Sequence, residues 1–398
     1  ASVGAWKKCY ANGKPAPFIM VAFSGAPLTQ TIYGFLLMNF IRSAVEGGCD
    51  AMLAMFTGIF AGLAIGLSAF FQGKVAAASA WAVRMCASPG RGDYAASRRA
   101  EEIVFACRNE LAELFDTGGA ERVVFTSNAT HALNLAIRSL VRPGSRVLIS
   151  SWEHNAVTRT LHSIPNVTIL TAEAPLFDDN GTLAAFSSAL EQRPDAVVCT
   201  CVSNVFGYIL PYAAIAALCR AAEVPLILDA SQAAGCVPVS LKALGAQFIA
   251  FPGHKGLYGP QGTGVLLCGG NADSLCPLLT GGTGSESVRQ EMPLYLPDRG
   301  EAGTHNVTGI AGLLEGVRFV RRTGQNRILA HERRLLARME RSLADMNDVQ
   351  LFTAEGENQA GVLSFVCDGW DCQDLARALG QRGIAVRAGL HCAPMAHS

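Results

Sequence analysis

The stretch FIAFPGHKGLYGPQGTG, residues 248–264, decides the fold of this chain. The apolar run at its start is bounded by Pro and Gly, which is typical of a buried strand that ends in a tight turn. The turn places Lys255 between His254 and a glycine. A lysine beside a buried strand loses its charge readily and is suited to forming a Schiff base with a carbonyl compound. Taken alone, the stretch is equally compatible with a surface turn that carries a solvated lysine.

Short apolar runs alternate with helical stretches through the middle of the chain. The apolar runs lie at residues 122–127, 146–151, 167–170, 195–203, 224–230, 247–251 and 264–268. Amphipathic helical spacing precedes the first run and separates several of the others. Continuous apolar strands joined by helices predict a mainly parallel sheet in an α/β fold. Because ligands of such sheets bind where strands end and helices begin, the site residues are expected at the strand ends.

Polar residues follow four of these strands. Residues 126–131 (TSNATH) place hydroxyl groups at the start of a helix, where they and backbone N–H groups can bind a phosphate, although an ordinary helix cap is at least as common. His154 and Asn204 each follow a strand, and Asp229 ends a very apolar one. A buried aspartate needs a cationic partner. Together with Lys255, these residues form the set that pyridoxal phosphate requires: a phosphate cradle, a stacking imidazole, a carboxylate for the ring nitrogen and a lysine for the aldehyde.

The composition narrows the class of protein. The chain has 398 residues and a formal net charge of zero, which gives no indication of nucleic-acid binding. Its 13 cysteines are scattered without metal-ligand spacing, so we expect no metal site and a reduced, cytoplasmic catalytic body rather than a disulfide framework. No typical secretory signal is visible at the start.

Residues 1–86 differ in character from the rest of the chain. Residues 51–73 carry no charged side chain and are long enough to cross a bilayer, and their small residues recur at a spacing suited to helix packing in lipid. With the apolar residues 28–45 they predict a hydrophobic helical hairpin, through which residues 28–73 could associate with a membrane. The alternative is a buried helix of a soluble domain.

Two strings in this segment, GAPLTQTIYGFLLMNFI and GIFAGLAIGLSAFFQGKVAAASA, resemble the proteolipid, or K, subunit of V-type rotary ATPases, over about residues 25–80. The resemblance implies that Thr29 and Gln30 correspond to a pair that helps to hold the transported ion. The membrane carboxylate of that family has no counterpart here, so we do not expect ion transport. A fragment fused upstream, by rearrangement or by assembly of the sequence record, is the favoured account.

The rest of the chain, about residues 88–398, resembles the cysteine desulfurases, which are class-V, fold-type-I pyridoxal-phosphate enzymes. The motifs that carry the resemblance are TSNATHALNLAI, EHNAVTR, SNVFG, LDASQAAG, GHKGLYGPQGTG, EAGTHN and AVRAGLHCAP. It implies a large domain with a mainly parallel, seven-stranded sheet and a small C-terminal α/β domain. We therefore expect a hydrophobic segment at 1–86, a large cofactor-binding domain at 87–315, and a small domain at 316–398 that is truncated relative to the family.

The resemblance implies roles for the residues around the cofactor ring. Lys255 would bind the aldehyde of pyridoxal phosphate and later move the Cα proton of the substrate. Asp229 would pair with the pyridinium nitrogen. Gln232 and Asn204 would bond the phenolic oxygen and the substrate side. His154 would stack on the ring and assist proton transfer.

The resemblance also implies a phosphate site that two subunits share. Thr130, the backbone of Ala129 and His254 would hold the phosphate. In this family a threonine of the partner subunit completes the site, and the motif EAGTHN assigns that role to Thr304, which would otherwise be an ordinary turn residue. A homodimer is therefore expected. Asn128 departs from the family, which usually has glycine at this position.

Cys392, in the string GLHCAP, lies where the family carries its sulfur-accepting nucleophile. Its thiolate would attack the sulfur of the cofactor-bound cysteine and keep it as a persulfide, with L-alanine as the product. Arg387 and His391 would favour the thiolate, and Arg387 would also contact the substrate. The implied function is a cysteine desulfurase that acts on L-cysteine and passes sulfur to an acceptor protein. The alternatives are another class-V activity, such as selenocysteine lyase, aminotransferase or epimerase, and an inactive chimeric or membrane-anchored chain.

The last part of the chain predicts one long charged helix at residues 321–346. Strands are predicted at residues 349–355, 361–367 and 384–389, with a helix at 371–383 between the last two. These elements fit a small α/β domain beside the large one.

Overall fold

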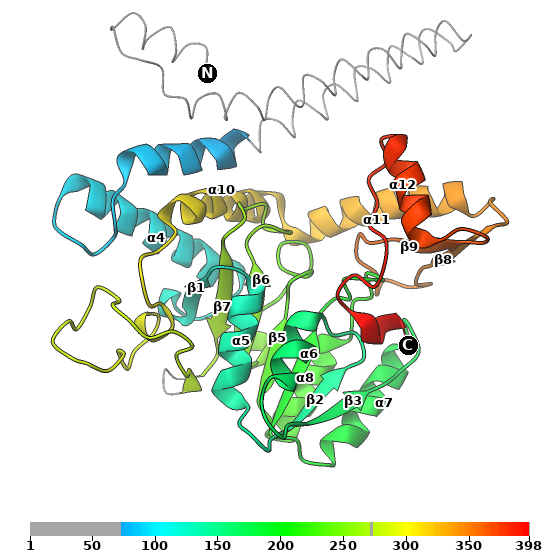
Figure 1. The fold of residues 1–398 in the computed structure, drawn as a ribbon, viewed down its shortest axis with the longest axis horizontal. Coiled ribbons are helices and arrows are strands. Elements are labelled where there is room, and N and C mark those ends of the chain that lie inside the picture. The colour runs from blue at the N-terminus through cyan, green and yellow to red at the C-terminus, as the bar shows by residue number, and fades with distance from the viewer. Residues whose placement is uncertain (1–72, 271–273, 398) are drawn as a thin grey trace, which may run out of the picture. The chain divides into compact units, whose positions relative to one another are not determined.

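The computed structural model describes residues 73–270 and 274–397 (Figure 1). The chain divides into two compact units, with the boundary between Met85 and Cys86. The second unit, residues 86–398, contains all of the residues that the cysteine desulfurase resemblance assigns to the cofactor and the substrate.

The first unit is described only over residues 73–85, which form a helix. The predicted hairpin of residues 28–73, apart from its last residue, lies outside the described part of the chain, as do Thr29 and Gln30. Across the residues that the structure describes, no helix is both long and apolar enough to cross a membrane.

The second unit contains, within the described residues, a seven-stranded sheet with the strand order β1-β7-β6-β5-β4-β2-β3. Neighbouring strands are parallel except where β7 pairs with β1 and β6. The strands are β1 (Val123–Thr126), β2 (Arg146–Ser150), β3 (Thr168–Ala172), β4 (Ala196–Thr200), β5 (Leu226–Asp229), β6 (Phe248–Pro252) and β7 (Gly264–Cys268). The mainly parallel sheet that the apolar runs predict is confirmed.

Helices cover both faces of this sheet (Figure 1). They are α4 (Ala95–Leu114), α5 (Ala129–Leu140), α6 (Asn155–His162), α7 (Asp179–Leu190), α8 (Tyr212–Ala221), α9 (Leu241–Leu244) and α10 (Val307–Thr323), with the 3-10 turns η1 (Ala120–Arg122) and η3 (Asp298–Gly300). The sequence did not predict α7, α9 or α10 as separate elements.

Two apolar clusters lie on opposite faces of the sheet, and β6 contributes to both. Phe248 and Ala250 belong to the cluster that includes residues of α5 and α6. Ile249 and Phe251 belong to the cluster that includes residues of α4 and α10. Because successive strand residues point to opposite faces, a sheet covered on both sides needs continuous apolar runs rather than alternating ones. This explains the sequence pattern and leaves the strand ends as the place for polar residues.

The C-terminal part consists of α11 (Gln325–Leu343), a two-stranded antiparallel sheet of β8 (Val349–Phe352) and β9 (Ser364–Cys367), α12 (Cys372–Gln381) and the 3-10 turn η4 (Pro394–His397). The division of the second unit near residue 315 stays a prediction.

Two expectations for this part were wrong. The predicted helix at 321–346 is broken, because Gly324 has φ of 86°, outside the helical range, and separates α10 from α11. Residues 384–389 do not form a strand. In the described chain no strand pairs with this segment, and Ile384 and Val386 remain 46% and 41% exposed.

Candidate functional site

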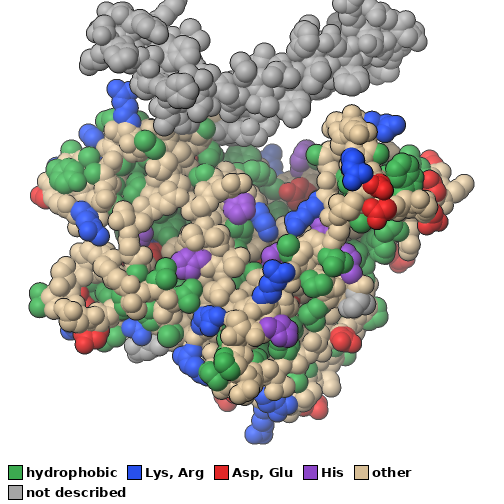
Figure 2. All heavy atoms as spheres, viewed as in Figure 1, with side chains coloured by type: hydrophobic (Ala, Val, Ile, Leu, Met, Phe, Trp, Pro, Cys, Tyr) green, Lys and Arg blue, Asp and Glu red, His purple; other side chains and the backbone are tan. Residues whose placement is uncertain are grey.

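A cavity at the carboxyl ends of the parallel strands brings together most of the predicted site residues. Its lining includes Ala129, Thr130, His154, Asn204, Asp229, Gln232, His254 and Lys255. These residues lie at the ends of five strands or in the segments that directly follow them, and the parallel sheet places those ends at one edge. In the space-filling view, His, Lys and Arg side chains are spread across the middle of the visible face, whereas acidic side chains lie mostly at its periphery (Figure 2).

Lys255 lies in the turn that follows β6. The turn is closed by backbone hydrogen bonds from Tyr258 N to Lys255 O at 2.9 Å and from Gly259 N to Gly253 O at 2.8 Å. The side chain is open to solvent in the cavity, yet the surrounding protein displaces water from the ammonium group and so lowers the pKa of Lys255. The negative charge of Asp229 acts in the opposite direction.

Asp229 is the last residue of β5 and is only 3% exposed. Its Oδ1 accepts a hydrogen bond from the backbone N–H of Ser231 at 2.9 Å. The expected cationic neighbour is Lys255, since the two charges interact across the cavity. Asp229 also pairs in register with Thr200, the last residue of β4.

His154 follows β2 and caps the first turn of α6. Its Nδ1 accepts a hydrogen bond from the backbone N–H of Ala156 at 3.0 Å, so the proton of the neutral ring is on Nε2. Burial lowers the pKa of His154, the cations Lys255 and Arg387 lower it further, and Asp229 raises it.

The N-terminus of α5 forms one wall of the cavity. Asn128 is its N-cap, and its side chain accepts a hydrogen bond from the N–H of His131 at 2.9 Å. Asn128 has φ of −174°, which is extended backbone that any residue adopts, so asparagine replaces glycine here without strain. Among the described residues, the N–H groups of Ala129 and Thr130 have no acceptor. Two free N–H donors at the start of a 12-residue helix suit an anionic group.

The loop that carries Cys392 is fixed to the rim of this cavity by two hydrogen bonds. The Cys392 carbonyl accepts from Asn155 N at 2.6 Å, and the His391 carbonyl accepts from Asn204 Nδ2 at 2.8 Å. Cys392 is exposed, and its Sγ lies 3.7 Å from Nη2 of Arg387. His391 and Cys392 both have left-handed backbones, with φ of 50° and 59°, a strained arrangement that is frequent at functional sites.

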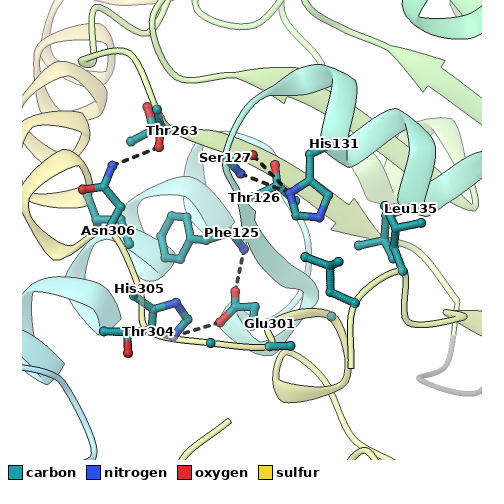
Figure 3. Close-up of a pocket in the computed structure, with 17 residues that line it drawn as sticks. Phe125, Thr126, Ser127, His131, Leu135, Thr263, Glu301, Thr304, His305 and Asn306 are labelled. Carbon is teal, nitrogen blue, oxygen red and sulfur yellow. Dashed lines mark hydrogen bonds and ion pairs between the residues drawn. The ribbon is translucent and has the colours of Figure 1, made fainter. Parts of the chain in front are cut away.

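Thr304 does not line this cavity. It lies in a neighbouring one, together with Ser127, His131 and His305, as the close-up shows (Figure 3). The segment that carries Thr304 is anchored by Glu301, whose Oε1 accepts hydrogen bonds from Phe125 N at 2.5 Å and Arg108 Nη1 at 2.7 Å. Its role at the phosphate therefore stays a prediction.

Two buried acidic groups were missed from the sequence. Glu153, between Trp152 and His154, is fully buried beside the cavity. Glu301 forms a buried ion pair with Arg108 and a second contact with His305. No local pattern marks Glu153, which lies three residues after the end of β2, as a buried residue. Nothing local in the sequence pairs Glu301 with a residue 193 positions away.

Comparison with known proteins places this geometry in a family. The sequence profile of the aminotransferase class-V family matches residues 68–398. Similar curated proteins include a probable cysteine desulfurase of Mycolicibacterium paratuberculosis (33% identity; 76% of this chain, 45% of the relative) and probable cysteine desulfurase 1 of Mycobacterium leprae (33% identity; 76% and 51%). The chain thus spans about half the length of these relatives. An apo cysteine desulfurase structure from Thermococcus onnurineus NA1 has 29% identity and a TM-score of 0.73, with 81% of this chain and 82% of that one covered. The chain belongs to the class-V aminotransferase family.

Proposed function

We propose that the chain is a pyridoxal-phosphate-dependent cysteine desulfurase, which converts L-cysteine to L-alanine and keeps the sulfur as a persulfide on Cys392. The observation that carries the proposal is the attachment of the Cys392 loop to the cavity that holds Lys255 and Asp229. Its two hydrogen bonds involve Asn155, which follows His154, and Asn204, which lines the cavity. The backbone of the proposed nucleophile is thereby held next to a site suited to amino-acid chemistry, although Cys392 itself does not line the cavity.

The residues of the cavity fit the cofactor. The free N–H groups of Ala129 and Thr130 suit its phosphate, His254 also lines the cavity, and Asp229 offers a buried carboxylate for the ring nitrogen. Gln232 would bond the phenolic oxygen. When bound, pyridoxal phosphate supplies an electron sink for the bonds at the Cα of the substrate.

The side chains have properties that suit the reaction. Lowering of the Lys255 pKa increases the fraction of free amine, which can bind the cofactor aldehyde and then accept a proton from Cα. The Nε2–H of His154 is available for hydrogen bonding in the cavity, because Nδ1 is used by Ala156. Nη2 of Arg387 lies 3.7 Å from Sγ of Cys392, and Arg387 would also contact the substrate.

The sulfur transfer is a balanced displacement. The Cys392 thiolate forms an S–S bond to the substrate sulfur while the Cβ–S bond breaks. The carbon side keeps that electron pair and takes up a proton, which gives alanine, and the sulfur stays on the enzyme as a persulfide. The names of the similar proteins support this activity over other class-V reactions, and a homodimer with Thr304 from the partner, together with a protein that accepts the sulfur, would complete the system.

The first experiment is the visible absorption of the purified chain with added pyridoxal phosphate. A band that Lys255→Ala removes is expected, since only the lysine can link covalently to the aldehyde at this place in the cavity. L-Cysteine should then yield alanine and a persulfide. Cys392→Ser should lose the persulfide, whereas Cys372→Ser, which removes another exposed cysteine, should keep it.

Two outcomes would contradict the proposal. Sulfide release at the parent rate by Cys392→Ser would exclude the persulfide role. Turnover of selenocysteine or of an amino-group acceptor, without turnover of L-cysteine, would favour another class-V activity.

A further inference from the structure

Glu153 is a buried acid that takes no part in the proposed reaction. It follows β2 within three residues, and its side chain is 0% exposed. Its Oε1 accepts hydrogen bonds from the Ser150 hydroxyl at 2.6 Å and from Thr200 N at 2.8 Å. Its other oxygen, Oε2, has no hydrogen-bond partner in the part of the chain that is described. A buried ionised carboxylate normally has its oxygens paired with donors or cations, so this arrangement disfavours the charged form.

The titratable groups that face Glu153 do not offset a negative charge. Burial raises the pKa of Glu153 to about 8; the hydrogen bonds from Ser150 and Thr200 act in the opposite direction, and the nearby negative charge of Asp229 adds to the rise. Cys199 and Cys201, in and just after β4, also face it, and burial raises the pKa of both thiols well above the ordinary value, so they are neutral. Among the described residues, no lysine or arginine forms a hydrogen bond or ion pair with Glu153, whose hydrogen bonds come from Ser150 and Thr200.

We propose that Glu153 is a positioning residue that is held as a neutral carboxylic acid, which keeps a second charge out of the buried region behind Asp229. The uncharged acid offers Oε1 to two donors without placing a second negative charge behind Asp229. The bond to Thr200 fixes the end of β4, which pairs in register with Asp229 on β5. Glu153 also directly precedes His154, so one buried side chain sets the position of two cavity residues.

The effect of Glu153 on cofactor binding rests on the proposed function, whereas its protonation state does not. The decisive measurements therefore use the full chain without cofactor. Infrared spectra should show the carbonyl band of a protonated carboxyl at pH 6.5, and the band should titrate away near pH 8. It should be absent from Glu153→Gln and retained in Glu355→Gln, a matched control that removes an exposed carboxylate.

Thermal unfolding provides a second test. The unfolded chain releases the Glu153 proton near pH 4.5, whereas the folded chain keeps it to about pH 8. The stability contribution of the proton is thus complete below pH 4.5 and is lost as the pH rises toward 8. Because Glu153→Gln cannot ionise, its Tm relative to the parent should rise steadily from pH 5 to pH 8.

The positioning role is tested in the presence of pyridoxal phosphate. Glu153→Ala removes the acceptor of the Thr200 N–H and should weaken cofactor binding roughly tenfold, while Glu153→Gln should restore it. Equal cofactor affinity in Glu153→Ala and the parent would overturn the positioning role. Parallel Tm curves for Glu153→Gln and the parent, or a parent without the infrared band, would overturn the neutral acid. If Glu153→Gln fails to fold, the titration of the parent band still decides the question.

Discussion

Removal of one partner of the buried Arg108–Glu301 ion pair is expected to destabilise the second unit strongly. The side chains of Arg108 and Glu301 are almost completely buried, at 8% and 3% exposure. The Glu301 carboxylate accepts hydrogen bonds from two nitrogens of the Arg108 guanidinium and from the backbone N–H of Phe125. Arg108 also lies over the Phe125 ring, 4.6 Å from its centroid.

Glu301→Ala leaves the guanidinium buried without its carboxylate. Breaking a buried ion pair by removing one partner costs about 3–5 kcal/mol. About 1–3 kcal/mol of this corresponds to a buried N–H that loses its acceptor, here that of Phe125. The expected loss in the free energy of unfolding is therefore about 3–5 kcal/mol. The same change should disorder the segment that presents Thr304, three residues further on.

Urea unfolding at neutral pH measures the effect. The control is Asp93→Ala, which removes the exposed ion pair between Asp93 and Arg98. Their side chains are 89% and 56% exposed, respectively, so the loss in the free energy of unfolding should be less than about 1 kcal/mol. The double change of Arg108→Met with Glu301→Leu should recover most of the loss, because no buried charge is left alone. A loss below about 1 kcal/mol for Glu301→Ala would refute the reasoning.

Three further predictions concern the cavity and its surroundings. Gly235→Ala should lower the free energy of unfolding by about 2–5 kcal/mol, because Gly235 has φ of 103° and a Cβ there would lie 2.0 Å from the Gly256 carbonyl oxygen. The control Gly380→Ala lies in open space within α12 and should be neutral or stabilising, so equal effects of the two variants in urea unfolding would contradict this prediction. His154→Gln should reduce the loss of Tm on acidification below about pH 6.5. Because the pKa of His154 is lowered by burial, the unfolded chain takes up this proton at a higher pH than the folded chain does, and the stability of the parent falls as the pH falls through that range. An unchanged dependence of Tm on acid pH in the variant would argue against the burial of His154. Thr304→Ala should weaken pyridoxal phosphate binding by roughly tenfold, because a hydrogen bond to a charged phosphate contributes about 1.5 kcal/mol or more, and Thr304→Ser should restore it. An unchanged dissociation constant in Thr304→Ala would show that Thr304 is not part of the phosphate site.

Much of the candidate site was predictable because it lies at strand ends. Asp229 ends and His154 follows an apolar run typical of a buried strand in a two-sided sheet, and parallel connections bring such ends to one edge. The structure confirms that they share a cavity with Lys255. Residues 384–389 show the limit of this reasoning, because an apolar run becomes a strand only when another strand is there to pair with it.

Other features depended on contacts between distant parts of the chain. Asn204, expected to face the cofactor and substrate, donates its side-chain hydrogen bond to the His391 carbonyl. Thr304 proved to lie in a neighbouring cavity. Neither arrangement has a local sequence signal, since the residues that surround Asn204 and Thr304 come from distant parts of the chain.

The sequence by itself determined the alternation of strands and helices, the mainly parallel character of the sheet and the identity of the polar residues at its carboxyl edge. These follow from local patterns, because apolar periodicity and turn residues act over a few positions. Only the tertiary structure decided that Glu153 lies fully buried beside Asp229, that Glu301 reaches Arg108, and that the Cys392 loop is fastened to the cavity. Burial, and the protonation and ion pairing that depend on it, arise when distant segments together exclude water from a side chain, and no short stretch of sequence contains that information.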